Sequence, residues 1–162
     1  MNGKTALRMV FLVGVLTLVL GAGQVLAQGT IAVSATVGRH CVVGAGSLEF
    51  GDYNPLAATD DLAQADFSVR CTRAATPARV GLSQGINFDG TTRRMASGTE
   101  FLAYGLFQDV GHSTPWTLTN DRAVDGTTMA QQTLTVYGVI TAGQDKPGGL
   151  VFSDTVNIIV VF

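Results

Sequence analysis

The chain of 162 residues has few cysteines, prolines, histidines and charged residues. It contains two cysteines, four prolines and two histidines, and only 14% of its residues are Asp, Glu, Lys or Arg. Ten basic and twelve acidic residues give a formal net charge of −2, without the basic face typical of nucleic-acid-binding proteins. The two cysteines match no zinc-motif spacing, and two histidines fall short of a typical zinc or copper site. We therefore expect no nucleic-acid partner and no metal site.

Catalytic groups are also scarce. Asp109, His112 and Ser113 lie close in sequence, but a Ser-His-Asp array is assembled by tertiary geometry, and residues 111–115 have the composition of a loop. The acidic pair at residues 60–61 lacks the alternating oxygen-ligand spacing of a calcium loop. His40 is the other histidine of the chain. We expect no catalytic residues, no cofactor and no small-molecule substrate.

Helical periodicity is absent from the sequence. Alternating and β-branched runs recur instead, and Gly, Asn, Asp or Pro interrupts them every 8 to 15 residues or so. This pattern predicts seven or eight antiparallel strands in one immunoglobulin-like β-sandwich. We expect the strands at residues 30–37, 41–43, 47–50, 65–73, 78–83, 101–108, 133–140 and 151–162.

Residues 1–27 have the pattern of a signal peptide. Lys4 and Arg8 precede an apolar stretch at residues 9–20, and residues 25–27 resemble a cleavage site. The apolar stretch is shorter than the roughly 20 residues that span a bilayer, although an uncleaved anchor is the alternative interpretation. Cleavage would start the mature chain at Gln28 with a net charge of about −4, because Lys4 and Arg8 would be lost.

The two cysteines, Cys41 and Cys71, favour a disulfide if the chain is exported, because their number is even and only one pairing exists. The loop of about 30 residues would stabilise the fold by roughly 3 to 4 kcal/mol in the chain-entropy model. A metal pair or a reactive thiol is the weaker alternative.

The beginning of the mature chain alternates almost at once. Ile31, Val33, Ala35 and Val37 lie on one face of an expected strand that precedes Cys41. Such an arm can leave its own domain and add to a sheet edge of another molecule. Alternation alone equally allows this segment to be the ordinary first strand of its own sandwich.

The C-terminal segment has the complementary property. Val156, Ile158, Val160 and Phe162 point one way in a strongly strand-forming segment. An edge strand this apolar would aggregate unless another strand paired with it. A domain that lacks one strand and extends an extra strand to its neighbour would form an open, head-to-tail filament.

Several motifs, in this order and spacing, resemble the spore coat protein U family, which includes the subunits of archaic chaperone–usher pili. After the arm and Cys41 come residues 48–53 (LEFGDY), residues 67–71 (FSVRC) and Arg94. Further along are residues 102–109 (LAYGLFQD), Trp116, residues 135–140 (TVYGVI) and residues 152–156 (FSDTV), followed by Phe162. Phe152 stands where such proteins often have Tyr, a departure that we expect to matter little.

The resemblance implies an incomplete immunoglobulin-like sandwich with an N-terminal donor strand. It divides the chain into a signal peptide (1–27), a donor-strand arm (28–38) and a pilin domain (39–162). Ile31, Val33, Ala35 and Val37 would be the donor residues, and Val156, Ile158, Val160 and Phe162 would form the edge that the chaperone engages. Cys41 and Cys71 would join the first two strands of the domain.

The resemblance also implies partners and a location. The partners would be a periplasmic chaperone, an outer-membrane usher, and other copies or related pilus subunits. The subunit would pass through the periplasm to a cell-surface fibre that supports adhesion or biofilm formation. A single domain with an arm to donate suggests a stem or minor shaft subunit. The alternative function is that of a self-complete secreted β-sandwich that binds a ligand.

Overall fold

A computed structural model describes residues 28–162 of the chain. The expected signal peptide, residues 1–27, lies outside the described residues. The chain divides into two units, Met1–Thr36 and Val37–Phe162. In the first unit, residues 28–36 form no helix or strand and are exposed.

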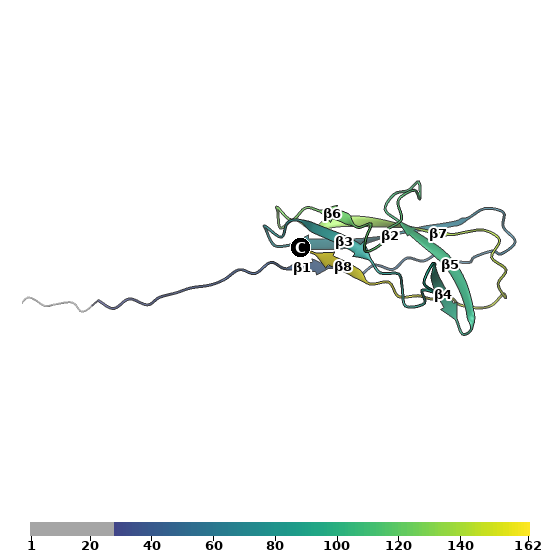
Figure 1. Cartoon of the computed structure of the whole chain (residues 1–162), viewed down its shortest axis with the longest axis horizontal. Coiled ribbons are helices and arrows are strands. Elements are labelled where there is room, and N and C mark those ends of the chain that lie inside the picture. The colour runs from purple at the N-terminus through teal and green to yellow at the C-terminus, as the bar shows by residue number, and fades with distance from the viewer. Residues whose placement is uncertain (1–27) are drawn as a thin grey trace, which may run out of the picture. The chain divides into compact units, whose positions relative to one another are not determined.

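The second unit is built from eight antiparallel strands in two sheets (Figure 1). The five-stranded sheet has the order β1-β2-β7-β5-β4, and the three-stranded sheet has the order β6-β3-β8. Residues 28–162 contain no helix, and therefore no helix that is long and apolar enough to cross a membrane. The bounds are β1 Cys41–Val43, β2 Asp61–Cys71, β3 Ala78–Leu82, β4 Arg93–Ser97, β5 Glu100–Phe107, β6 Arg122–Val124, β7 Gln132–Ile140 and β8 Ile158–Val161.

Alternation along the strands decides which side chains enter the core. In β2, Phe67, Val69 and Cys71 are buried, whereas Arg70 between them is exposed. The antiparallel partner β7 follows the same rule, and Phe67 lies opposite the buried Leu134. One face of each strand is therefore apolar and one is polar, as expected of a sheet that faces a core on one side only.

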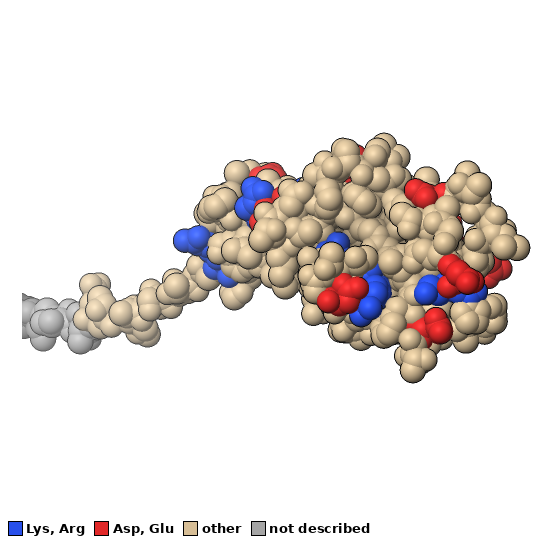
Figure 2. Space-filling model, turned by 45° about the vertical axis from the view of Figure 1, so that its right-hand side comes forward, with Lys and Arg blue, Asp and Glu red and all other residues tan. Residues whose placement is uncertain are grey.

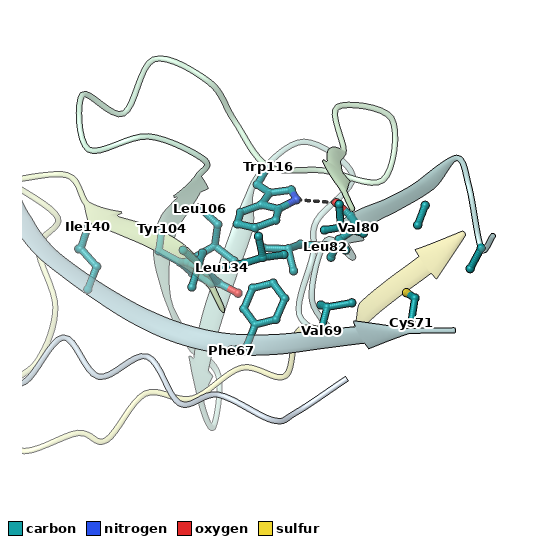
Figure 3. Packing of buried hydrophobic residues seen from close by; sticks show 14 of the residues in the cluster. Phe67, Val69, Cys71, Val80, Leu82, Tyr104, Leu106, Trp116, Leu134 and Ile140 are labelled. Atoms are coloured by element: carbon teal, nitrogen blue, oxygen red, sulfur yellow. Dashed lines mark hydrogen bonds between the residues drawn. The ribbon is translucent and has the colours of Figure 1, made fainter. Parts of the chain in front are cut away.

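Trp116 lies at the centre of the core between the two sheets (Figure 3). Its side chain is fully buried, its Nε1 donates a 2.8 Å hydrogen bond to the carbonyl oxygen of Val80, and its ring packs 5.6 Å from that of Phe67. The indole links the large sheet to the small one, because Phe67 belongs to β2 and Val80 to β3. Its polar atom is satisfied, as burial requires.

The strand pattern confirms the all-β prediction but corrects several details. The strand expected at residues 65–73 starts four residues earlier, at Asp61. Strands β4 and β6 were not expected, because β4 (RRMAS) has no β-branched residue and β6 has only three residues. Residues 30–37 and 47–50 form no strand, and only Ile158–Val161 of the expected strand 151–162 does. A strand needs a hydrogen-bonded neighbour, and periodicity does not reveal whether one exists.

Candidate functional site

A long groove opens beside the core of the sandwich. It has a volume of about 880 Å³. One wall is residues 46–53, which follow β1, and the other is residues 146–154 together with Val156 and Ile158, which lead into β8. The two walls thus continue the edge strands of the two sheets, since β1 borders the large sheet and β8 the small one.

The floor of the groove is the core itself. Side chains of β2, β5 and β7 that point between the sheets line it, with Leu82 of β3 and Met95 of β4. Protein interiors are close-packed and rarely hold voids larger than a water molecule. The groove reaches core side chains such as Phe67 and Leu106. The apolar floor residues are Ala65, Phe67, Leu102, Tyr104, Leu106, Val136 and Ile140.

The edge of β8 that faces away from β3 is open. Strand β8 pairs with β3 from Leu82↔Ile158 to Arg79↔Val161, and the amide of Ser83 donates to the carbonyl oxygen of Asn157. Backbone groups of successive residues point to opposite sides of a strand. Those of Val156, Ile158 and Val160 are therefore directed away from β3. An incoming strand could pair with this edge.

A polar network holds the β8-side wall in place. Oδ1 of Asp154 accepts hydrogen bonds from the amides of Ile86 and Asn87 and from Nδ2 of Asn87, at 3.0 to 3.2 Å. Its Oδ2 accepts a 2.6 Å bond from the hydroxyl of Tyr104. Ser153 exchanges two backbone hydrogen bonds with Ala96, which ties the wall to β4. Contacts with residues 86–87, with Tyr104 and with Ala96 therefore hold the wall in place.

Beneath this network, Arg93 is 6% exposed. Its guanidinium donates to the carbonyl oxygens of Leu82, Ser83 and Trp116 at 2.7 to 3.2 Å. Burial lowers the pKa of Arg93, while the nearby Tyr104 and Asp154 act in the opposite direction. The buried cation thus braces the strand end that carries Leu82 of the groove.

The opposite wall is anchored by Tyr53 at its far end. The Tyr53 hydroxyl donates to the carbonyl oxygen of Thr141 at 3.2 Å and accepts from the amide of Gln144 at 2.9 Å. Gln144 in turn pairs through its side-chain amide with both backbone groups of Ala103. Leu48 and Phe50 lie over Gly138 of β7, where an added Cβ would come within 2.7 Å of Cζ of Phe50. Because Gly138 has no side chain, residues 48 and 50 of this wall can pack closely against β7.

The expected donor residues are highly exposed. Ile31 and Val33 are each 90% exposed and Val37 is 88% exposed, and Ala35 is exposed as well. Single exposed apolar side chains are common, but an alternating row of them is not an ordinary surface feature.

The expected acceptor residues divide into two groups. Val156 and Ile158 line the groove, and together with Val160 they are partly buried against the core. Phe162 is 42% exposed and does not line the groove. The roles of all four in assembly stay predictions.

The disulfide is present between Cys41 and Cys71, as predicted. It joins β1 to β2 at directly opposed positions, with a Cα–Cα distance of 4.0 Å. It fixes the start of the domain immediately after the arm. The wall at residues 46–53 begins only a few residues later.

The residues weighed for catalysis form a local turn. Asp109 accepts hydrogen bonds from the amides of Ser113 and Thr114, which lower the pKa of its carboxyl group. His112 packs edge-on against Phe107 at 5.4 Å and makes no hydrogen bond to Ser113. Among residues 28–162, no group of three or more His, Cys, Asp or Glu side chains could hold a metal ion.

Comparison with known families bears on this geometry. The family model described as "Spore Coat Protein U domain" matches residues 27–159. The chain belongs to the Spore Coat Protein U domain family. A curated member, "Protein U" of Myxococcus xanthus, is 32% identical over an alignment 146 residues long, and the match covers 79% of this chain and 80% of that protein.

One solved structure has a fold similar to that of this chain. It is described as the CsuC-CsuE chaperone-tip adhesion subunit pre-assembly complex from the archaic chaperone-usher Csu pili of Acinetobacter baumannii. The TM-score is 0.54 and the identity is 24%, over 78% of this chain but only 40% of that chain. The likeness establishes the immunoglobulin-like fold. The matched descriptions name a coat protein domain and a pilus assembly complex.

Several residues that shape the groove were not singled out from the sequence for this role, namely Asp154, Tyr104, Arg93 and Gly138. Asp154 and Tyr104 fall within motifs that carried the resemblance, at residues 152–156 and 102–109. Their joint role depends on a contact between residues 50 positions apart. No local pattern reports such a contact.

Proposed function

We propose that the chain is a structural subunit of a surface pilus or fibre, and that the arm of one copy fills the groove of the next. The observation that carries this proposal is the groove of about 880 Å³ beside the open edge of β8. A complete sandwich would have a strand there. The chain carries a spare alternating segment outside its strands, at residues 30–37.

The dimensions agree with this proposal. Eight extended residues span roughly 27 Å at about 3.4 Å per residue. The β8-side wall comprises residues 146–154 with Val156 and Ile158, and β8 continues the same edge to Val161. The arm would cover this wall along its length, with backbone groups pairing to Val156, Ile158 and Val160 and every second side chain pointing to the floor.

The energetics are sufficient for assembly. Burying Ile31, Val33, Ala35 and Val37 would contribute roughly 5 to 8 kcal/mol at about 1.5 to 3 kcal/mol for each large side chain and less for Ala. Each backbone hydrogen bond would add about 0.5 to 1.5 kcal/mol. The groove-lining residues of β2, β5 and β7 are apolar or aromatic apart from Asp66, which suits an apolar row on the arm.

Before assembly, the groove would need a temporary occupant, because exposed edges and apolar floors promote aggregation. A periplasmic chaperone would supply that strand, an outer-membrane usher would exchange it for the arm of the next subunit, and the fibre would serve adhesion or biofilm formation. The family membership and the fold shared with a chain of a chaperone–subunit complex support this sequence of partners.

The test is assembly of a Val33→Asp variant beside the unmodified chain, each co-expressed with its chaperone and examined as ladders on unboiled gels. A charge on the buried face of the arm should abolish ladder growth and leave the chaperone-bound subunit soluble. Ser34→Asp carries the same charge on the opposite face and should still polymerise. If the unmodified chain forms no ladder, or Val33→Asp unfolds as a monomer, the self-complete binding domain becomes the better interpretation.

A further inference from the structure

Positive charge gathers at one end of the sandwich. Cys71 ends β2, β1 pairs with that end, and only six residues separate it from the start of β3. Around it lie five arginines and two carboxylates, Asp121 and Asp125, which give the end about three net positive charges. Arg79 pairs with Asp121. The five residues of this arginine end are Arg39, Arg70, Arg73, Arg79 and Arg122.

Negative charge gathers at the other end. Asp61 begins β2 opposite Ile140, and Gln144 contacts Ala103 near the start of β5. Five carboxylates lie here with Lys146, whose Nζ is 3.9 Å from Glu100. Arg94 also lies near this end, over the ring of Phe101, but its charge is balanced by its ion pair with Asp89. The end carries about four net negative charges. The five residues of this carboxylate end are Asp52, Asp60, Asp61, Glu100 and Asp145.

The two ends are separated by the length of β2. Its eleven residues span roughly 34 Å, whereas charges in physiological salt are screened over about 8 Å. The opposite charges therefore do not neutralise each other within one molecule. Figure 2 shows one face of the molecule, on which both kinds of charge occur at each end but basic side chains prevail at the left-hand end and acidic side chains at the right-hand end.

The arm joins the sandwich at its arginine end, and the groove reaches the carboxylate end. The arm runs directly into Arg39 of the arginine end, since only Gly38 lies between Val37 and Arg39. Strand β8 runs toward the arginine end, where Val161 pairs with Arg79. The groove reaches the carboxylate end, because Asp52 and Lys146 line it. Val151, which also lines it there, is 85% exposed.

An arm can enter the groove in two directions. If the arm runs antiparallel to β8, its last residues leave the groove at the carboxylate end of the acceptor. The donor's arginine end then meets the acceptor's carboxylate end. If the arm runs parallel to β8, its last residues leave the groove at the arginine end of the acceptor, and the arginine ends of donor and acceptor meet. Like charges across an interface oppose association, and complementary ones steer it.

We propose that the arginine end of one copy docks on the carboxylate end of the next, and that this complementarity selects an arm antiparallel to β8. The inference rests on the proposed function. The partner is a second copy of this chain, and the contact involves charged side chains at the ends of the sandwich rather than the apolar floor of the groove. The junction would speed encounter and set the direction of the arm, while the groove would supply the lasting affinity.

The test follows polymer growth of the mature chain after dilution from denaturant with its disulfide intact, at low and at high salt. Arg39→Gln/Arg73→Gln and Glu100→Gln/Asp145→Asn should each slow growth about three- to tenfold at low salt and have little effect at high salt. Controls with the same charge changes are Gln64→Glu/Val110→Glu and Gln64→Lys/Val110→Lys. These exposed sites lie away from both ends, and the control variants should grow like the unmodified chain.

A peptide of residues 28–38 separates the junction from the groove. It lacks the arginine end, so its binding to the groove should be unchanged by either charge variant. If Val33→Asp fails to stop growth, the proposed function is wrong. If Val33→Asp stops growth but the end variants match their controls, only the charge junction is wrong. Faster growth of the arginine variant at low salt would instead indicate a parallel arm.

Discussion

The hydroxyl of Tyr104 donates a 2.6 Å hydrogen bond to Oδ2 of Asp154. Tyr104 is a core residue of β5, and Asp154 belongs to the β8-side wall of the groove. Burial, and then the hydrogen bond to Asp154, raise the pKa of Tyr104, which keeps the hydroxyl protonated as a donor. The contact fixes the distance between the floor and this wall.

Removing that contact should loosen the wall. Tyr104→Phe should lower the free energy of unfolding by about 1.5 to 3 kcal/mol, because the hydrogen bond is to a charged group. Asp154→Ala should cost more, since the amides of Ile86 and Asn87 lose their partner too. Urea denaturation of the mature chain measures both. Tyr137→Phe, at a partly exposed tyrosine of β7, is the matched control, and equal midpoints for Tyr104→Phe and the control would contradict the prediction.

A side chain at Gly138 should close part of the groove. Because an added Cβ would lie 2.7 Å from Cζ of Phe50 and about 3.0 Å from Leu48, Gly138→Val should push both side chains into the space for the arm. The variant should bind a peptide of residues 28–38 at least tenfold more weakly, yet still donate its own arm to an unmodified subunit. Gly148→Ala, where nothing lies within 4 Å, is the control. Unchanged peptide binding by Gly138→Val would show that the arm does not pass over β7.

Loss of the disulfide should destabilise the domain. Cys41 and Cys71 are 30 residues apart, and a loop of this length corresponds to about 3 to 4 kcal/mol. We expect Cys41→Ser/Cys71→Ser to lower the free energy of unfolding by that amount, which urea denaturation would show as a lower midpoint. The unmodified chain in excess reductant should shift by the same amount. A midpoint that is insensitive to reductant would mean that β1 contributes little to the fold.

Acid should weaken the loops that three carboxylates organise. Amides of Thr92 and Thr91 lower the pKa of Asp89, those of Ser113 and Thr114 lower the pKa of Asp109, and the hydroxyl and amide of Thr127 lower that of Asp125. A carboxyl group with a lowered pKa stabilises the folded state above its unfolded pKa of about 4, and this contribution is lost as the pH falls below that value. Urea midpoints should therefore decrease between about pH 5 and pH 2.

Asparagine variants isolate this effect. Asp89→Asn/Asp109→Asn/Asp125→Asn should have a lower midpoint at pH 5 and a flatter dependence on pH than the unmodified chain. Asp145→Asn, at an exposed residue, serves as the control and should follow the unmodified curve. If the triple variant keeps the full acid dependence, other carboxylates are responsible.

Alternation was enough to predict most strands and the inward face of each. Phe67, Val69 and Cys71 alternate with polar residues in the sequence, and all three are buried in β2, because a half-buried strand must alternate. Alternation was not enough at residues 47–50. There Leu48 and Phe50 are partly buried and Glu49 is exposed, yet no neighbouring strand completes a ladder. The strand expected at these residues is therefore wrong, because strand pairing cannot be read from the side-chain pattern.

The groove was harder to foresee than its walls. Val156 and Ile158 were assigned to an open edge from their apolar character, and both line the groove. Asp154, Tyr104 and Gly138 were not, because each acts through residues far away in the sequence. The separation of charge between the two ends was equally hidden, since the arginines of one end are scattered from Arg39 to Arg122.

The amino-acid sequence by itself determined the β class, the possible disulfide partners and which face of each strand is apolar, because these depend on local periodicity and on a cysteine count of two. Only the tertiary structure decided that the two sheets leave a groove between residues 46–53 and the wall before β8. It also decided that Asp154 locks that wall and that opposite charges collect at opposite ends. These features depend on which strands become neighbours, and the pairing of distant segments is not encoded in any one of them.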